Sequence, residues 1–138
     1  NSKHFINGDA LKLDEYNLPL CDFCLTSPPF MPKSDTENPF TNCESESSYE
    51  RYLEDIKIIF SKIKKIMKPD SYIVSEVSNL KINNELTTLA WDIGKTIAEV
   101  LHFEGEIIVS WTSSKMYTEE STYGYGYDHS YCLIYKNI

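Results

Sequence analysis

The sequence has 138 residues, of which 41% are hydrophobic and 25% are charged, which suits a single folded domain with its own core. No apolar run approaches the ~20 residues that a membrane-spanning helix needs, and the first ten residues lack the apolar region of a signal peptide. The net charge of −8 argues against a free-standing nucleic-acid-binding protein, because binding to phosphates requires a basic face. We therefore expect a cytoplasmic protein that does not bind a membrane.

Two short strands are predicted near the start of the chain. Residues 4–7 have the composition of a strand that turns at Gly8 and Asp9, and "CDFCLT", residues 21–26, has that of a second strand. The polar segment that follows, residues 31–47, is rich in turn-forming residues and is predicted to be a loop. A loop of this length inside a compact domain usually has a function.

The remaining predicted elements are two helices and three strands. Residues 47–70 place apolar side chains at every third or fourth position, with Ser48 available as a cap and lysines near the end, as in an amphipathic helix. A second helix is predicted for residues 85–103. Strands are predicted for residues 71–77, 106–111 and 130–135, with a loop at 78–84 after the first and a loop at 112–129 between the last two.

This order of elements predicts one α/β domain over residues 1–138. Strands that alternate with helices form a mostly parallel sheet covered by helices, and the last two strands, which have no helix between them, form an antiparallel pair at one edge. Ligands of such sheets bind beyond the carboxyl ends of the strands. We expect Asp9, the turn after residue 26 and the loop after Val77 to meet there.

Cys21 and Cys24 form a C-x-x-C pair within the second predicted strand. Structural zinc sites usually combine two such pairs, or one pair with histidines at ligand spacing, and neither accompanies this pair. Buried free thiols are therefore the favoured interpretation, and no metal site is predicted.

The turn Ser27-Pro28-Pro29-Phe30 is the most informative motif in the sequence. Two consecutive prolines fix two φ angles and remove two N–H donors, and Ser27 is held extended by the proline after it. The result is a stiff turn that presents carbonyl and hydroxyl acceptors beside an aromatic ring. A planar base with an exocyclic amino group fits this arrangement, because the ring stacks on the base and the acceptors take the two amino hydrogens.

Holding both N–H bonds localises the lone pair of an aryl amine on its nitrogen. That nitrogen could then attack a methyl donor directly, and the rate would come from positioning and electrostatics without a metal or a covalent intermediate. The alternative interpretation is a diproline turn that merely ends a strand. For Asp9, the corresponding alternative is an Asx turn.

Several segments together resemble the amino-methylating DNA methyltransferases, specifically the N4-cytosine and N6-adenine type with circularly permuted motifs. They are "NGDALKL", "LPLCDFCLTSPPF", the helix and strand of "YERYLEDIKIIFSKIKKIMKPDSYIVSEV", and "DHSYCLIYKN" near the end. The resemblance covers nearly the whole chain. Serine in the Thr-Ser-Pro-Pro-Phe signature, instead of aspartate or asparagine, favours N4 of cytosine over N6 of adenine.

The resemblance implies a Rossmann-like methyltransferase fold and S-adenosylmethionine as the methyl donor for a flipped DNA base. It assigns the following roles: catalysis to Ser27, Pro28, Pro29 and Phe30; cofactor binding to Asp9, Thr26 and Glu76; and the base pocket to Trp111, Tyr117 and Tyr123, for which packing and loop filling are an equal alternative. A restriction-modification system is the usual setting of such enzymes.

One family feature is missing from the sequence. The Phe-x-Gly-x-Gly cofactor loop does not occur, and in permuted members it follows the matched segment, after a target-recognition region. The resemblance therefore implies the catalytic half of the enzyme, inactive alone. Its expected partners are the missing half, or a second copy of itself, and DNA held by the cations of the recognition region. Alternatives are a methyltransferase for RNA or another amino group, and a non-enzymatic domain that has lost cofactor binding.

Overall fold

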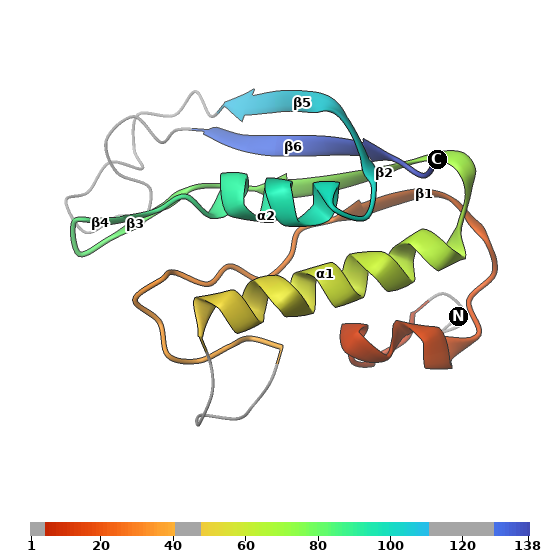
Figure 1. Ribbon diagram of the computed structural model, residues 1–138, viewed down its shortest axis with the longest axis horizontal. Helices are drawn as coiled ribbons and strands as arrows, with labels where there is room; N and C mark the ends of the chain where they lie inside the picture. Colours follow the sequence, from red (N-terminus) through yellow and green to blue (C-terminus); the bar gives the residue numbers. More distant parts are fainter. Residues whose placement is uncertain (1–4, 41–47, 111–128) are drawn as a thin grey trace.

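The computed structural model describes residues 5–40, 48–110 and 129–138. The helical elements are a 3₁₀ helix, η1, and two α-helices, α1 and α2, and the strands are β1 to β6 (Figure 1). Their bounds in chain order are η1 Ala10–Tyr16, β1 Cys21–Thr26, α1 Tyr49–Ile66, β2 Met67–Val77, β3 Leu80–Ile82, β4 Glu85–Thr87, α2 Leu89–Ala98, β5 His102–Ser110 and β6 His129–Lys136.

Four strands form the main sheet in the order β1-β2-β6-β5. β1 and β2 are parallel, and β6 is antiparallel to both of its neighbours, so β1, β2 and β5 run in one direction and β6 runs against them. β5 and β6 form the antiparallel pair at one edge. The predicted α/β fold with an antiparallel edge pair is confirmed, and the sheet formed by the described strands is mixed, with one parallel pairing and two antiparallel ones.

Helix α1 forms where the apolar spacing predicts it. Ser48 caps its start by accepting a hydrogen bond from the backbone N–H of Arg51 at 3.1 Å. The helix ends at Ile66, earlier than the predicted end near residue 70, and β2 begins at the next residue. Asn137, after the last strand, holds this junction, because its side-chain amide donates to the carbonyls of Lys64 and Met67 and to that of Lys68.

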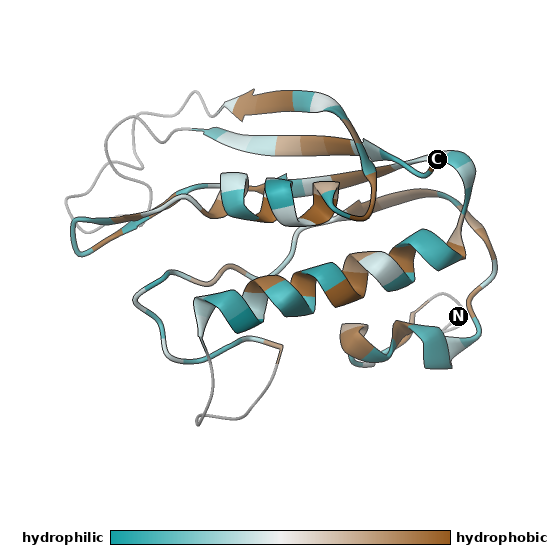
Figure 2. Cartoon of the chain, viewed as in Figure 1, coloured by the Kyte–Doolittle hydropathy of each residue, from teal (hydrophilic) through white to brown (hydrophobic). Residues whose placement is uncertain are grey.

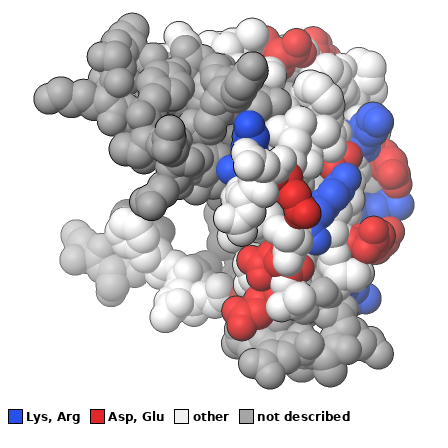
Figure 3. Space-filling model, turned by 90° about the vertical axis from the view of Figure 1, so that its left-hand side faces the viewer, with Lys and Arg blue, Asp and Glu red and all other residues white. Residues whose placement is uncertain are grey.

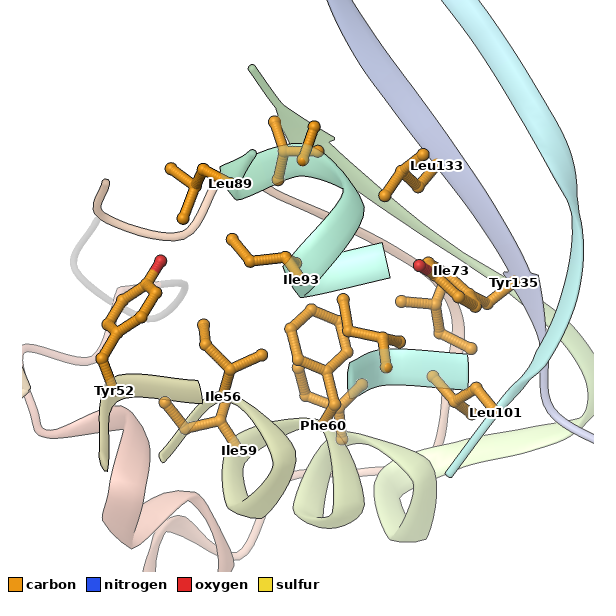
Figure 4. Packing of buried hydrophobic residues seen from close by; sticks show 14 of the residues in the cluster. Tyr52, Ile56, Ile59, Phe60, Ile73, Leu89, Ile93, Leu101, Leu133 and Tyr135 are labelled. Atoms are coloured by element: carbon orange, nitrogen blue, oxygen red, sulfur yellow. The ribbon is translucent and has the colours of Figure 1, made fainter. Parts of the chain in front are cut away.

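Both α-helices lie on the same face of the sheet, with their apolar sides toward it (Figures 1 and 2). The centre of the core is made by fully buried side chains of α1 and α2 against those of β2 and β6, drawn in Figure 4. They include Tyr52, Ile56 and Phe60 of α1, Ile93 of α2, Ile73 of β2 and Tyr135 of β6. This packing fixes the carboxyl ends of β1 and β2 relative to the start of α1.

Two predicted elements differ from the structure. Residues 5–7 are not a strand but an exposed segment, and Asp9 caps the start of η1. The predicted second helix is shorter, because its first residues form the hairpin β3–β4. Asn83 and Asn84 adopt φ values of 49° and 64° at the tip of that hairpin, which is the geometry of a two-residue turn that asparagine accepts readily.

Candidate active site at the ends of strands β1 and β2

The turn Ser27–Phe30 directly follows β1, at the carboxyl end of the parallel pair β1 and β2. Ser27 and Pro29 are exposed, Pro28 is buried, and Phe30 is half-buried against the core. Within the described part of the chain, the Ser27 hydroxyl makes no hydrogen bond. The turn therefore combines a rigid base with a hydroxyl that remains available to a ligand.

Tyr52 of α1 anchors the turn through a hydrogen bond. Its hydroxyl donates to the carbonyl of Pro29 at 2.8 Å, and its ring stacks on that of Phe40, with 5.6 Å between the centroids. Burial raises the pKa of Tyr52 well above its ordinary value, so the hydroxyl keeps its proton and remains a donor. The carbonyl of Pro29 is thus used within the protein, whereas the acceptors expected from the sequence are the carbonyls around Ser27 and Pro28 and the Ser27 hydroxyl.

A polar cluster fastens the segment after the turn to the hairpin and to α2. The backbone N–H of Lys33 donates to the Thr87 hydroxyl at 3.0 Å, and the Lys33 ammonium lies 3.5 Å from the Asp92 carboxylate. Asp92 also accepts hydrogen bonds from Tyr49 and from Thr88, each at 2.9 Å. Burial and the bond to Asp92 raise the pKa of the Tyr49 hydroxyl, which therefore stays protonated.

A second attachment links the same segment to α1. The side-chain amide of Asn38 donates to Asp55 Oδ2 at 2.8 Å, and both residues are buried. Asn38 in turn accepts from the backbone N–H of Phe40 at 3.0 Å. Arg51 Nε lies 3.3 Å from Asp55 Oδ1 without the alignment of a hydrogen bond, so that pair is mainly electrostatic. Residues 31–40 are accordingly irregular in shape but tightly attached.

Replacing Tyr52 by phenylalanine tests the hydrogen bond between its hydroxyl and the carbonyl of Pro29. We expect the free energy of unfolding to fall by about 0.5–1.5 kcal/mol, because one intramolecular hydrogen bond is lost while the ring stays. Urea unfolding measures this value. Tyr72→Phe is the matched control, because the Tyr72 side chain is 46% exposed and its hydroxyl has no hydrogen bond within the described residues. Equal losses for both variants would contradict an anchoring role for Tyr52.

The predicted cofactor residues do not come together. Thr26 ends β1 beside Ser75 of β2, close to the turn. Glu76 accepts a hydrogen bond from Ser130 at 2.8 Å, and it alternates along β2 with the core residues Ser75 and Val77, so it lies on the sheet face opposite the helices. The predicted base-pocket residues Trp111, Tyr117 and Tyr123 lie outside the described residues.

Asp9 is far from the turn, contrary to the expectation that both open at one edge. Its carboxylate accepts from the N–H of Leu11 at 2.9 Å and caps η1. Lys62, in the last third of α1, donates to the carbonyl of Leu11 and pairs with Asp14. Tyr52, which holds the turn, precedes Lys62 by ten residues on the same helix. At 1.5 Å per residue, the two residues are about 15 Å apart along the helix axis. In this conformation the capping interpretation of Asp9 applies.

The described residues do not fit S-adenosylmethionine on their own. They provide the turn for an amino group, but no glycine-rich backbone that could approach a charged cofactor, and Asp9 points elsewhere. Two buried polar atoms near the end of β2, Ser75 Oγ and Asn79 Nδ2, have no hydrogen-bond partner among the described residues. Asn79 Oδ1 meanwhile accepts from the N–H of Ala90 at the start of α2.

The charges on the drawn end of the molecule are of both signs, with lysine, arginine, aspartate and glutamate side chains interspersed (Figure 3). Among the described residues, no cluster of histidine, cysteine and acidic side chains could hold a metal ion. Nor does a helix in this part of the chain have the length and apolarity required to cross a membrane. A continuous basic surface for a nucleic acid is not visible on this face.

The diproline turn thus lies at the carboxyl end of a parallel strand pair, anchored from the following helix, in an α/β fold of the Rossmann-like methyltransferase class. The sequence agrees with this class: residues 21–137 match the model of a DNA methylase family that modifies N6 or N4 amino groups. The chain belongs to this family. Comparison with curated proteins found no match.

Solved structures with the same fold include three of TTHA0409, a protein of Thermus thermophilus assigned as a DNA modification methylase. A selenomethionine form is 19% identical with a TM-score of 0.64, and a second form is 16% identical with a TM-score of 0.65. A third, complexed with S-adenosyl-L-methionine, is also 16% identical with a TM-score of 0.65. Each alignment covers 94% of this chain and 50%, 51% and 53% of the other, so this chain spans about half the length of these proteins.

Proposed function

We propose that this chain is the half of a DNA methyltransferase that holds the base to be methylated. The enzyme transfers a methyl group from S-adenosylmethionine to the exocyclic amino group of a flipped base, and N4 of cytosine is the favoured target. The observation that carries the proposal is the exposed hydroxyl of Ser27, which has no hydrogen bond to any described residue, on a turn that Tyr52 anchors through Pro29. Membership of the DNA methylase family and the cofactor complex of the Thermus protein support the reaction class.

In this proposal, each part of the turn has a separate task. Ser27 and the neighbouring carbonyls accept the amino hydrogens, and Phe30 stacks on the base. S-adenosylmethionine, held by a complementary half, would supply the methyl group, and the task of the turn would be to hold the amino nitrogen with its lone pair localised toward it. Tyr52, Asn38 and Asp55 act only through the turn and the segment behind it, because they keep both in one position.

The cofactor and the DNA backbone require residues beyond those described. We propose that a complementary half of the fold, with a glycine-rich loop and a cationic recognition region, supplies them. The acidic charge of this chain and the mixed charges of Figure 3 agree with that division. A nearby gene for a restriction nuclease would place the enzyme in a restriction-modification system.

The 138-residue chain alone should show no saturable binding of S-adenosylmethionine in isothermal titration calorimetry, and no transfer of labelled methyl groups to DNA. The reason is the incomplete cofactor cradle. Tight binding by the isolated chain would overturn the proposed division into halves. The target itself is identified separately by nucleoside analysis of DNA treated with the complete enzyme, in which 4-methylcytosine is expected. Labelling of RNA alone would overturn the DNA assignment.

A further inference from the structure

One face of the main sheet has no helix on it within the described parts of the chain, because α1 and α2 both cover the other face (Figure 1). The alternation of side chains along the strands and the pairing register assign the residues of this uncovered face, here called the open face. They are Phe23 and Leu25 of β1, Tyr72, Val74 and Glu76 of β2, Ser130, Cys132, Ile134 and Lys136 of β6, and Ile107 and Val109 of β5.

The centre of the open face is apolar and accessible. Leu25 is 67% exposed, and Phe23 and Ile107 are each 56% exposed, although all three have large apolar side chains. The register places Leu25 beside Val74 and Val74 beside Ile134 in one apolar row across three strands. A parallel strand pair normally has both faces covered, and a contiguous apolar surface of this kind marks an interaction site.

The charges of the open face stand at its two ends. Lys136 lies in the row of Tyr72 at one end, and Glu76 lies four residues further along β2 at the other. A two-fold axis that runs across the strands superposes each end of one copy on the opposite end of its partner. Such an axis packs the apolar rows of the two copies against each other in the middle. It also brings the end of each copy that holds Lys136, which pairs with Asp70 at 2.8 Å, next to the Glu76 end of the other copy.

The size of the surface also suits a copy of this chain. Four strands spaced ~4.8 Å apart, each with about four residues at ~3.3 Å, would bury on the order of 1,000 Å² in total when two sheets pack face to face. That area is at the lower limit of stable interfaces. The net charge of −8 on each copy opposes association further, so a dimer with a dissociation constant in the micromolar range is the expected strength.

We propose that, when no complementary half is present, two copies of this chain pack their open faces together as a two-fold dimer. The proposal does not depend on methyl transfer. It concerns a sheet face and not the site at the carboxyl ends of β1 and β2.

Sedimentation velocity over a concentration series from about 1 to 100 μM, which brackets micromolar affinity, tests the dimer. The sedimentation coefficient of the unmodified chain should rise from the monomer to the dimer value. Ile107→Asp should keep the chain monomeric across the series. Ile108→Asp is the matched control, because Ile108 is 62% exposed on the same strand but faces the other side of the sheet, and this variant should dimerise as the unmodified chain does.

Circular dichroism melting shows whether each variant folds. If Ile107→Asp fails to fold, Phe23→Lys, at the opposite edge of the open face, replaces it. A chain that stays monomeric throughout overturns the proposal. So does a dimer that is insensitive to both Ile107→Asp and Phe23→Lys, because such a dimer does not use the open face.

Discussion

Ser27→Ala should lower the turnover of the complete enzyme by about 10²–10³-fold, which is the usual cost of losing one preorganised polar contact to the reacting group. The Ser27 hydroxyl is exposed and unbonded within the described residues, so its removal leaves no protein group without a partner. We therefore expect the melting temperature to remain unchanged. Single-turnover methyl transfer with labelled S-adenosylmethionine measures the effect on chemistry separately from that on product release.

Ser34→Ala is the control for this loss of turnover. Ser34 lies on the same segment and is also exposed, so its replacement should leave both turnover and stability unaffected. Near-normal turnover in the Ser27 variant would remove the hydroxyl from the mechanism and leave the turn with a purely structural role. A loss of turnover accompanied by an equal loss of stability would point to the same conclusion.

The amphipathic pattern was sufficient to predict α1, because its signals are local. The apolar spacing and the Ser48 cap all act within a few residues along the chain. The end of α1 was predicted less accurately, since Asn137 sets it from the far end of the sequence. A side chain that joins segments so far apart along the chain leaves no periodic trace near the helix it terminates.

The hairpin β3–β4 was missed although a local signal for it exists. Asn83-Asn84 is a pair that tolerates positive φ at both positions, but the apolar residues around it also fit the start of a helix. The pairing of β3 with β4 decides between the two structures. Glu85 to Thr87 then present Thr87 to the backbone of Lys33, so this misassigned segment borders the candidate site.

The location of the turn could be predicted from the sequence, but its attachments could not. Thr26 to Phe30 follow a strand in a recognisable pattern. Tyr52, by contrast, was one aromatic residue among many, and its bond to Pro29 depends on how α1 packs beneath the turn. Asp9 shows the opposite case, because a carboxylate after Gly8 suits both a ligand site and a helix cap, and the structure shows the cap.

Asp55→Ala should lower the free energy of unfolding by about 2–3 kcal/mol, because a buried hydrogen bond to a charged group is lost and Asn38 is left with a buried, unpaired amide. Asp55 is fully buried on α1, and its Oδ2 accepts from Asn38 at 2.8 Å. The effect should also reach the segment behind the turn, since Asn38 positions Phe40, which stacks on Tyr52. Urea unfolding measures the first effect, and amide hydrogen exchange at residues 31–40 measures the second.

Glu54→Ala is the matched control for Asp55, because Glu54 precedes it on the same helix but is exposed, and its replacement should change stability by less than about 0.5 kcal/mol. Asp55→Asn separates charge from hydrogen bonding. The asparagine keeps an acceptor for Asn38 but loses the attraction to Arg51 Nε, 3.3 Å away and partly exposed, so it should recover most of the lost stability. If Asp55→Asn is as unstable as Asp55→Ala, the ion pair with Arg51, and not the link to Asn38, holds the segment behind the turn.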